Sequence, residues 1–261
     1  MLFAMPDRRQ HRGANPEDIH AFAESEWPAL RTAVAELCWL LTRDYAENSA
    51  LKLVGDRHNL SARQRMAVRR CACPAQSLKQ RTQTRTTLER HLGGCVGVDG
   101  YNLLITLESA ISGGLILVGL DGCYRDLASI HGTYRRVEET VPALRLLSEY
   151  LTKAGMGAVD WYLDRPVSNS GRLKQLMLSE AAGLSSHSDG TCKWNIELVD
   201  SPDRALLQHP GPIVTTDSVV LDRCGSWINL AAEIINGRIP RTWKVSLGGN
   251  GGEGAMLHRF A

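Results

Sequence analysis

Five short apolar runs in the second part of the chain each end at or near an aspartate. The runs cover 96–98, 115–120, 158–163, 194–199 and 212–214, and the aspartates are Asp99, Asp121, Asp164, Asp200 with Asp203, and Asp217. Helical spacing predicts helices over 136–154, 173–182 and 218–236. This alternation predicts a doubly wound α/β domain with a mainly parallel sheet. Because ligands bind outside the carboxyl ends of such strands, we expect the carboxylates to converge in one cleft.

The first third of the chain is polar and basic. Between residues 51 and 92, ten Lys and Arg residues face two acidic residues, a local net charge of +8, although the whole chain carries +2. The capping-box pattern of Ser61 and Gln64 predicts the start of a helix, and another helix is expected over 77–91. The sequence therefore predicts four parts: a disordered N-terminus over 1–14, a basic helical domain over 15–92, an α/β domain over 93–247 and a flexible tail over 248–261.

A basic module beside an acidic one is typical of proteins with a polyanionic partner. The first candidates for contacts with a phosphate backbone are Arg63, Arg65, Arg69 and Arg70. The alternative is that these arginines form a solvated helical face.

The sequence carries no signal for membrane insertion or export. No apolar run approaches the ~20 residues of a membrane helix, and the first residues do not form a signal peptide. The seven cysteines are odd in number and scattered, which favours reduced thiols. We therefore expect a cytoplasmic protein with no membrane partner.

Several carboxylates held together repel one another unless a cation joins them. A site with oxygen ligands alone favours Mg²⁺ or Mn²⁺ over zinc. A single aspartate after a strand is commonly a helix cap or a turn residue. The pairing of Asp99 with Asp217 favours a metal site over that alternative.

Val98-Asp99-Gly100-Tyr101-Asn102 resembles the opening motif of NYN-type nucleases, which belong to the PIN-like group. Trp161-Tyr162-Leu163-Asp164 resembles their next strand and its acidic end, and Val214-Thr215-Thr216-Asp217-Ser218 resembles their late Thr-Ser-Asp motif. The resemblance covers about residues 95–236 and implies a PIN-like fold. More narrowly, the whole chain resembles an uncharacterised prokaryotic family that joins a basic helical module to such a domain.

The resemblance also implies residue roles. Asp99, Asp164 and Asp217 would be catalytic and would hold the metal, with Asp203 as a further ligand, a role for which Asp200 competes. Asn102, beside Asp99, would contact the substrate.

Two segments depart from the family pattern, an insertion over 111–135 and a polar loop over 166–172. The insertion adds Asp121 and Asp126, either as ligands or as turn residues. Ser168, Asn169 and Arg172 on the loop are candidate substrate-binding residues, because a guanidinium and backbone amides at a helix start suit a phosphate. The alternative for Arg172 is a surface arginine.

The resulting prediction is a metal-dependent ribonuclease that hydrolyses phosphodiester bonds and leaves a 5′-phosphate and a 3′-hydroxyl, as the resemblance implies. DNA stays open as a substrate. One alternative is a non-catalytic nucleic-acid-binding or regulatory protein with an inactive PIN-like domain. Another is a metal-dependent phosphatase or nucleotidase that acts on a small molecule.

Other groups of residues are alternative candidates for a functional or structural site. Cys71, Cys73, His91 and Cys95 could form a structural zinc site, although their spacing is not that of a standard finger. His131 as a base and Cys123 as a nucleophile each lack a recognisable partner. Trp227 lies in the helix expected over 218–236, where core packing is favoured; an exposed Trp227 would instead support a homodimer.

Overall fold

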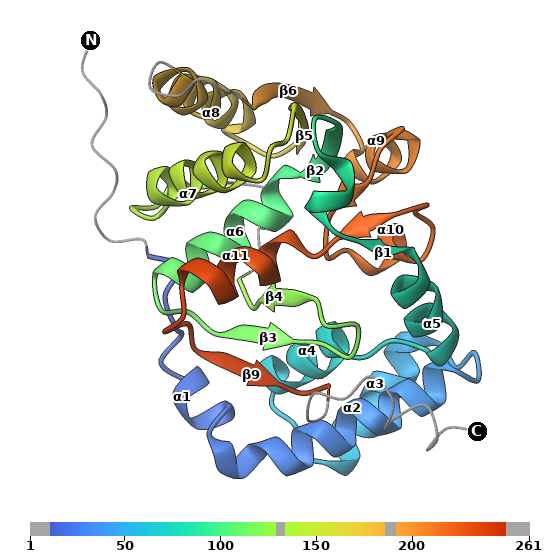
Figure 1. Ribbon diagram of the computed structural model, residues 1–261. Coiled ribbons are helices and arrows are strands. Elements are labelled where there is room, and N and C mark those ends of the chain that lie inside the picture. Colours follow the sequence, from blue (N-terminus) through green and yellow to red (C-terminus); the bar gives the residue numbers. More distant parts are fainter. Residues whose placement is uncertain (1–10, 129–133, 186–191, 249–261) are drawn as a thin grey trace.

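The computed structural model describes residues 11–128, 134–185 and 192–248 (Figure 1). Its main sheet has six parallel strands in the order β1-β8-β7-β2-β5-β6. The strands are β1 Arg85–Thr86, β2 Cys95–Asp99, β5 Ala158–Asp164, β6 Lys193–Val199, β7 Ile213–Val214 and β8 Trp227–Ile228. The predicted α/β class with a parallel sheet is confirmed.

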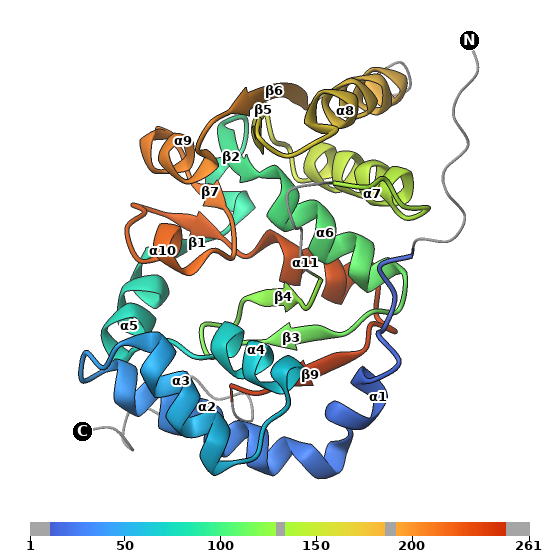
Figure 2. The same ribbon diagram turned by 180° about the vertical axis from the view of Figure 1, so that it is seen from behind.

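Helices cover both faces of this sheet. They are α6 Gly100–Ile111, α7 Thr140–Lys153, α8 Ser170–Ser185, α9 Pro202–Gln208, α10 Ser218–Leu221 and α11 Leu230–Arg238. One apolar core joins α6, α7, α8 and α11 to the strands, with Leu144, Trp161 and Ile234 among its buried members. A smaller core packs α9 and α10 around Leu206 and Trp227. Figures 1 and 2 show these two groups of helices on opposite sides of the sheet.

A second sheet has three strands in the order β4-β3-β9. They are β3 Ile116–Val118, β4 Tyr124–Asp126 and β9 Lys244–Ser246, with β3 antiparallel to β4 and parallel to β9. The strand expected over 115–120 therefore exists, but it does not join the main sheet. Asp121, which follows it, consequently does not belong to the carboxyl edge where the other strand ends meet.

The N-terminal region is helical, as predicted. Its α-helices are α1 Asp18–Ala21, α2 Trp27–Leu41, α3 Glu47–Arg57, α4 Ala62–Cys71 and α5 Ala75–Thr84. The capping box is present at the start of α4: Ser61 Oγ accepts from the Gln64 N–H at 3.2 Å, and Gln64 Oε1 accepts from the Ser61 N–H at 3.0 Å. Leu37 and Val68 of these helices share one core with Leu117 and Val245 of the second sheet. The N-terminal helices thus pack on the inserted strands (Figure 1).

Three sequence expectations about elements need correction. The helix expected over 77–91 ends at Thr84, because Arg85 and Thr86 pair with β8. The helix expected over 218–236 is instead α10, strand β8 and α11. Trp227 lies in the strand, is 1% exposed and donates from Nε1 to the Arg81 carbonyl at 2.8 Å, so it gives no support to a homodimer.

Of the N-terminus expected to be disordered, the structure describes residues 11–14, and two of these form ion pairs. His11 pairs with Glu139 at 2.7 Å, and the Arg12 guanidinium pairs with the buried Glu108. Residues 1–10 and 249–261, which include nearly all of the expected tail, lie outside the described residues. None of the helices in the described part of the chain is long and apolar enough to cross a membrane.

Candidate functional site

The site lies where the strand order changes direction. From β2 the chain proceeds to β5 and β6 on one side, and then returns to β7 and β8 on the other. Asp99 is the last residue of β2, and Asp217 follows the end of β7 by three positions. A switch point of this kind leaves a crevice at the carboxyl ends of the strands, and this is where open α/β sheets bind ligands.

Both aspartates cap the helix that follows them. Asp99 Oδ1 accepts from the Asn102 N–H at 3.3 Å at the start of α6. Asp217 Oδ1 accepts from the backbone N–H groups of Val219 at 2.9 Å and Val220 at 3.1 Å at the start of α10. The capping role considered for a single aspartate is therefore real at both positions. In each case it uses only one carboxylate oxygen.

Side-chain hydrogen bonds connect the two strand ends. Thr215 Oγ1 donates to Asp99 Oδ2 at 2.9 Å. Asn102 Oδ1 accepts from the backbone N–H of Thr216 at 3.0 Å and from its hydroxyl at 2.9 Å. Asn102, expected to contact a substrate, thus holds the loop after β7 against the start of α6. This network fixes the position of Asp99 relative to Asp217.

The carboxylates at this edge influence one another. Burial, together with repulsion from Asp217 and Asp164, raises the pKa of Asp99 to about 7 despite the hydrogen bonds from Thr215 and Asn102. Burial and the charge of Asp203 raise the pKa of Asp164. Burial and the charge of Asp217 raise the pKa of Asp203. The four aspartates predicted from the sequence therefore form one electrostatic group.

Three of these aspartates, Asp99, Asp203 and Asp217, line a cleft of about 650 Å³. Asp164 is not among the lining residues, but its charge acts on Asp99, and the charge of Asp203 acts on Asp164. The other cleft residues come from helices α3, α4, α6 and α10, from strand β4 of the second sheet, and from the loops after β4 and β7. They are Glu47, Met66, Arg69, Arg70, Tyr101, Asn102, Ile105, Arg125, Asp126, Ala128, Thr216, Ser218 and Val219.

The spacing of the carboxylates limits how they can hold a cation. Among the residues that the structure describes, no three of the four aspartates have oxygen atoms that all lie within 4.8 Å of one another. Mg²⁺ commonly keeps several water ligands and binds through only one or two carboxylates. This arrangement therefore suits a cation held partly through water, and it does not form a closed cage of protein ligands.

Three arginines also line the cleft: Arg69, Arg70 and Arg125. Arg69 pairs with Glu47 at 2.5 Å on the surface, where both side chains are about half exposed. Arg70 donates to the carbonyls of Asp126 and Ala128. Arg125 donates from Nε to the Thr216 carbonyl at 3.0 Å, one residue before Asp217. The helical N-terminal region and the second sheet thus place positive charge beside the carboxylates.

Two buried polar atoms in the cleft have no hydrogen-bond partner in the described part of the protein. They are Tyr101 Oη and Asp126 Oδ1, and the latter lies 3.5 Å from Arg70 Nη1 in an ion pair. A buried polar group without a partner costs roughly 1–3 kcal/mol, so the Tyr101 hydroxyl is a natural contact for a bound molecule. Tyr101 belongs to the same sequence motif as Asp99, but the sequence alone did not identify it as a candidate site residue.

The other basic residues expected to hold a phosphate backbone are engaged elsewhere. Arg63 binds the buried Asp18 through two nitrogens, and Arg65 binds Asp56 and the Leu60 carbonyl. Seven of the ten basic residues between 51 and 92 form ion pairs: Lys52, Arg57, Arg63, Arg65, Arg69, Arg70 and Arg81. Five of the seven pair with acidic side chains outside this segment, whereas Lys52 and Arg65 share Asp56 within it, so the local charge of +8 is balanced in part by other segments.

The polar loop before α8 has a structural role in the described fold. Asn169 has a positive φ of 71° and donates from Nδ2 to the Tyr134 carbonyl at 3.0 Å, while the Ser168 carbonyl accepts from the Tyr134 N–H. Arg172 is exposed and reaches Asn169 Oδ1 at 3.5 Å. None of these three residues is among the cleft-lining residues that the structure describes.

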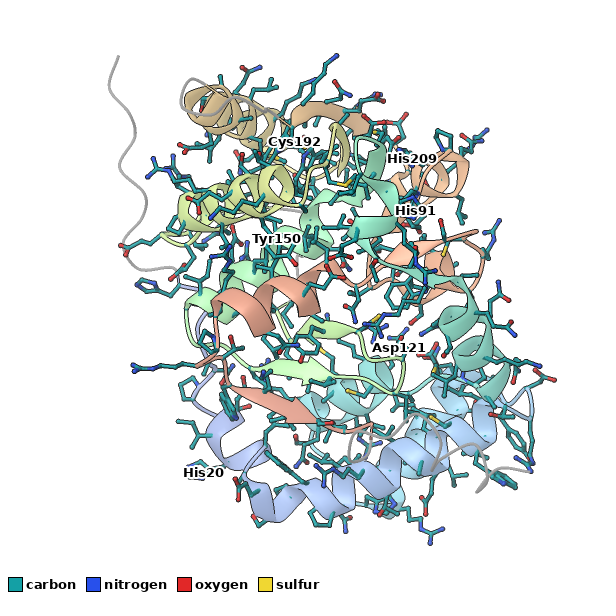
Figure 3. The ribbon with its side chains drawn as sticks, in the orientation of Figure 1. His20, His91, Asp121, Tyr150, Cys192 and His209 are labelled. Carbon is teal, nitrogen blue, oxygen red and sulfur yellow. The ribbon has the colours of Figure 1, made fainter. Side chains whose placement is uncertain are left out.

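The zinc site considered for Cys71, Cys73, His91 and Cys95 does not assemble in the structure. Cys71 and Cys73 are buried near Asp121, whereas His91 contacts the Thr86 hydroxyl at 3.1 Å. Figure 3 shows His91 and Asp121 well separated. Cys95 has other partners, described below.

The remaining candidates also find structural explanations or lie outside the described residues. Asp121 is 2% exposed at its side chain and pairs with Arg81 and Arg125, so it is not a ligand in the cleft. Cys123 is completely buried, which raises its pKa well above the usual value and argues against a nucleophile. His131 lies outside the described residues.

The fold and the cleft define an α/β protein whose parallel strand ends place carboxylates in one cleft with arginines from a helical N-terminal region. A family model described as a domain of unknown function (DUF5616) matches residues 88–233, more than half of the chain, so the chain belongs to that family. A model described as a protein of unknown function (DUF434) matches residues 29–83. Uncharacterized protein MJ0935 of Methanocaldococcus jannaschii is 28% identical over 193 residues, which cover 74% of this chain and 89% of that protein. No solved structure matches the chain.

Proposed function

We propose that this protein is a metal-dependent nuclease with a PIN-like domain, and that it hydrolyses phosphodiester bonds of RNA in the acidic cleft. The observation that carries the proposal is the juxtaposition of Asp99, Asp203 and Asp217 with Arg69 and Arg70 in one cleft. Carboxylates suit a divalent cation, and guanidinium groups suit a phosphate. A phosphodiester substrate needs both.

The donor set fits Mg²⁺ or Mn²⁺. All the candidate ligands are carboxylates, and the raised pKa of Asp99 reflects burial and repulsion that a cation would offset. Asp99 and Asp217 would hold the cation, with Asp203 and Asp164 contributing directly or through water. Such a cation lowers the pKa of a bound water and stabilises charge that develops on phosphate oxygens.

The chain's own residues would orient the reaction. Thr215 and Asn102 fix the Asp99 carboxylate, as described above. Arg69 can exchange its surface pair with Glu47 for a substrate phosphate at little cost, because exposed ion pairs contribute only about 0–1 kcal/mol. The unpartnered Tyr101 hydroxyl can donate to a phosphate or a ribose oxygen.

A second candidate is a phosphatase or nucleotidase for a small molecule, with the same cation and the same residues. The cleft volume of about 650 Å³ favours it, because this lies within the range of sites for single small ligands. A purely nucleic-acid-binding protein is less well supported, since most of the basic side chains of the N-terminal region are paired within the chain.

A substrate panel separates these candidates. Purified protein with Mg²⁺ or Mn²⁺ is given a labelled RNA oligonucleotide, a DNA oligonucleotide of the same sequence and a nucleoside monophosphate. The nuclease proposal expects internal cleavage of RNA. Release of inorganic phosphate from the monophosphate, with the RNA intact, would replace it by the small-molecule proposal.

A further inference from the structure

A second cluster of metal-binding side chains lies away from the acidic cleft. It consists of Cys95 on β2, Asp160 on β5 and His209 directly after α9. Their ligand atoms all lie within 4.8 Å of one another. Among the described residues, no other group of three or more Cys, His or acidic side chains meets this distance limit. Figure 3 labels His209 beside α9.

The sheet register brings these residues to one face. Asp160 pairs with Gly97, two positions after Cys95 on the neighbouring strand, so Cys95 and Asp160 point to the same side. Gly97, between them, leaves the space for the imidazole: a Cβ at this position would lie 2.8 Å from His209 Cγ. The His209 side chain is accordingly 1% exposed.

The thiol and the carboxylate face the same ring nitrogen. Cys95 Sγ lies 3.8 Å from His209 Nε2, and Asp160 Oδ2 lies 3.3 Å from the same atom. In a nucleophilic Cys-His-Asp triad, the thiol and the carboxylate would face opposite nitrogens of the ring. Burial and the nearby Asp160 also raise the pKa of Cys95 to about 11, contrary to what a nucleophilic cysteine needs.

The distances match those between ligands around a tetrahedral zinc ion. Zn–S near 2.3 Å and Zn–N near 2.05 Å at a tetrahedral angle place the two ligand atoms about 3.6 Å apart, and nitrogen and oxygen ligands about 3.4 Å apart. The observed separations of 3.8 and 3.3 Å are within a few tenths of these values.

Groups that could serve as outer contacts of the metal ligands lie next to His209 and Asp160. The Gly211 N–H lies 3.1 Å from His209 Nδ1 and can donate to it, while the Gly211 carbonyl lies 3.2 Å from the same nitrogen. Metal binding at Nε2 would place the ring proton on Nδ1, which would then donate a hydrogen bond to the Gly211 carbonyl. Asn195 Nδ2 donates to Asp160 Oδ1 at 2.7 Å, which leaves Oδ2 toward His209.

We propose that Cys95, Asp160 and His209 bind a zinc ion, with water as the fourth ligand. The Asp160 side chain is 26% exposed, which gives solvent access to the site. The ion would join the end of α9 to strands β2 and β5. Since the first turn of α9 carries Asp203, the same ion would help to fix that side of the cleft.

Cobalt substitution tests the site directly. Chelator-treated full-length protein is titrated with Co²⁺, and Zn²⁺ affinity is measured by competition with a chromophoric chelator. We expect stoichiometric binding, a thiolate-to-cobalt charge-transfer band and strong visible bands of four-coordinate Co²⁺. Cys95→Ser should abolish the charge-transfer band and weaken Zn²⁺ binding by more than about 100-fold, whereas Asn195→Ala, which removes an outer contact, should cost about 10- to 100-fold.

Two control variants make the result specific. Cys192→Ser removes another buried thiol and should leave the band unchanged. Asp99→Asn changes the acidic cleft and should also leave it unchanged, which keeps this test independent of the nuclease proposal. No charge-transfer band in the wild-type protein, or a band that survives in Cys95→Ser, would overturn the zinc site. Circular dichroism confirms that each variant is folded.

Discussion

Replacing Asp121 by Asn tests the buried ion-pair network that joins the N-terminal helices to the α/β domain. Asp121 accepts from Arg81 Nη1 at 2.6 Å, from Arg125 Nη1 at 2.9 Å and Nη2 at 2.7 Å, and from the Cys123 N–H at 3.0 Å. The side chains of Asp121, Arg81 and Arg125 are 2%, 2% and 7% exposed. The change therefore removes the carboxylate charge from two buried guanidinium groups.

The expected loss of unfolding free energy depends on the partners that each arginine keeps after the change. Breaking a buried pair typically costs about 3–5 kcal/mol, because the remaining charge has no counter-charge. Arg81 keeps Asp222 at 2.6 Å, whereas Arg125 keeps, among the described residues, its hydrogen bond to the neutral Thr216 carbonyl. Asn keeps one carbonyl oxygen, which can still accept up to two hydrogen bonds. We therefore expect a loss near the lower bound, about 3 kcal/mol, or a fall in Tm of roughly 10 °C.

The pH dependence gives the same variant a second readout. Burial alone would raise the pKa of Asp121, but the charges and hydrogen bonds of Arg125 and Arg81 outweigh burial and hold it well below the usual range. A lowered folded-state pKa stabilises the protein above the unfolded pKa of about 3.9, and this contribution is lost as the pH falls. The difference in unfolding free energy between wild type and Asp121→Asn should therefore shrink as the pH falls below about 4.

Urea unfolding followed by circular dichroism measures both effects. Asp222→Asn is the matched control, because Asp222 also pairs with Arg81 but is 34% exposed, so its loss should be smaller. An Asp121→Asn protein within about 0.5 kcal/mol of wild type would refute the inferred role of this network.

Three further changes probe other parts of the account. Arg69→Gln should weaken RNA binding roughly tenfold, as expected for about 1.5 kcal/mol in one charged phosphate contact, and should lower the salt dependence measured by fluorescence anisotropy. Arg57→Gln is the control, because it removes the same charge from an exposed arginine that pairs with Glu36. An equal loss of RNA affinity in this control would argue against a specific role for Arg69. Ser61→Ala should cost about 1 kcal/mol in urea unfolding by removing the α4 cap, and no loss would contradict that role. Trp227→Phe should cost about 2 kcal/mol, from lost volume and the lost bond to the Arg81 carbonyl, and a neutral result would mean that β8 repacks.

The convergence of Asp99 and Asp217 could be predicted from the sequence because it follows from a local rule. Each residue ends an apolar run, and the ends of parallel strands meet at one edge of the sheet. The electrostatic coupling of Asp164 and Asp203 to this pair follows in the same way. Capping geometry is local too, which is why Ser61 and Gln64 could be recognised.

Contacts between distant segments could not be predicted. The strand that ends before Asp121 looks like the others in sequence, yet it pairs with β9 near the end of the described chain. β1 and β8 have only two residues each, too few for a periodic pattern, so Trp227 was expected in a helix. Arg63 could not be distinguished from Arg69, because the partner of Arg63, Asp18, lies 45 residues away.

The same limit applied to Cys95, whose sequence neighbours suggested a site with Cys71, Cys73 and His91. Its actual partners are 65 and 114 residues further along the chain, on β5 and after α9. Only the sheet register and the space left by Gly97 bring them together.

The most direct test of the central proposal is Mn²⁺-dependent cleavage of labelled single-stranded and structured RNA by wild type and Asp99→Asn. Asp200→Asn is the control, since Asp200 is 77% exposed and pairs with Arg165 outside the cleft. The account predicts cleavage by wild type and by Asp200→Asn, and its loss in Asp99→Asn with RNA binding retained. No cleavage by wild type with either Mg²⁺ or Mn²⁺, together with tight and salt-sensitive RNA binding, would contradict it and would favour a binding protein.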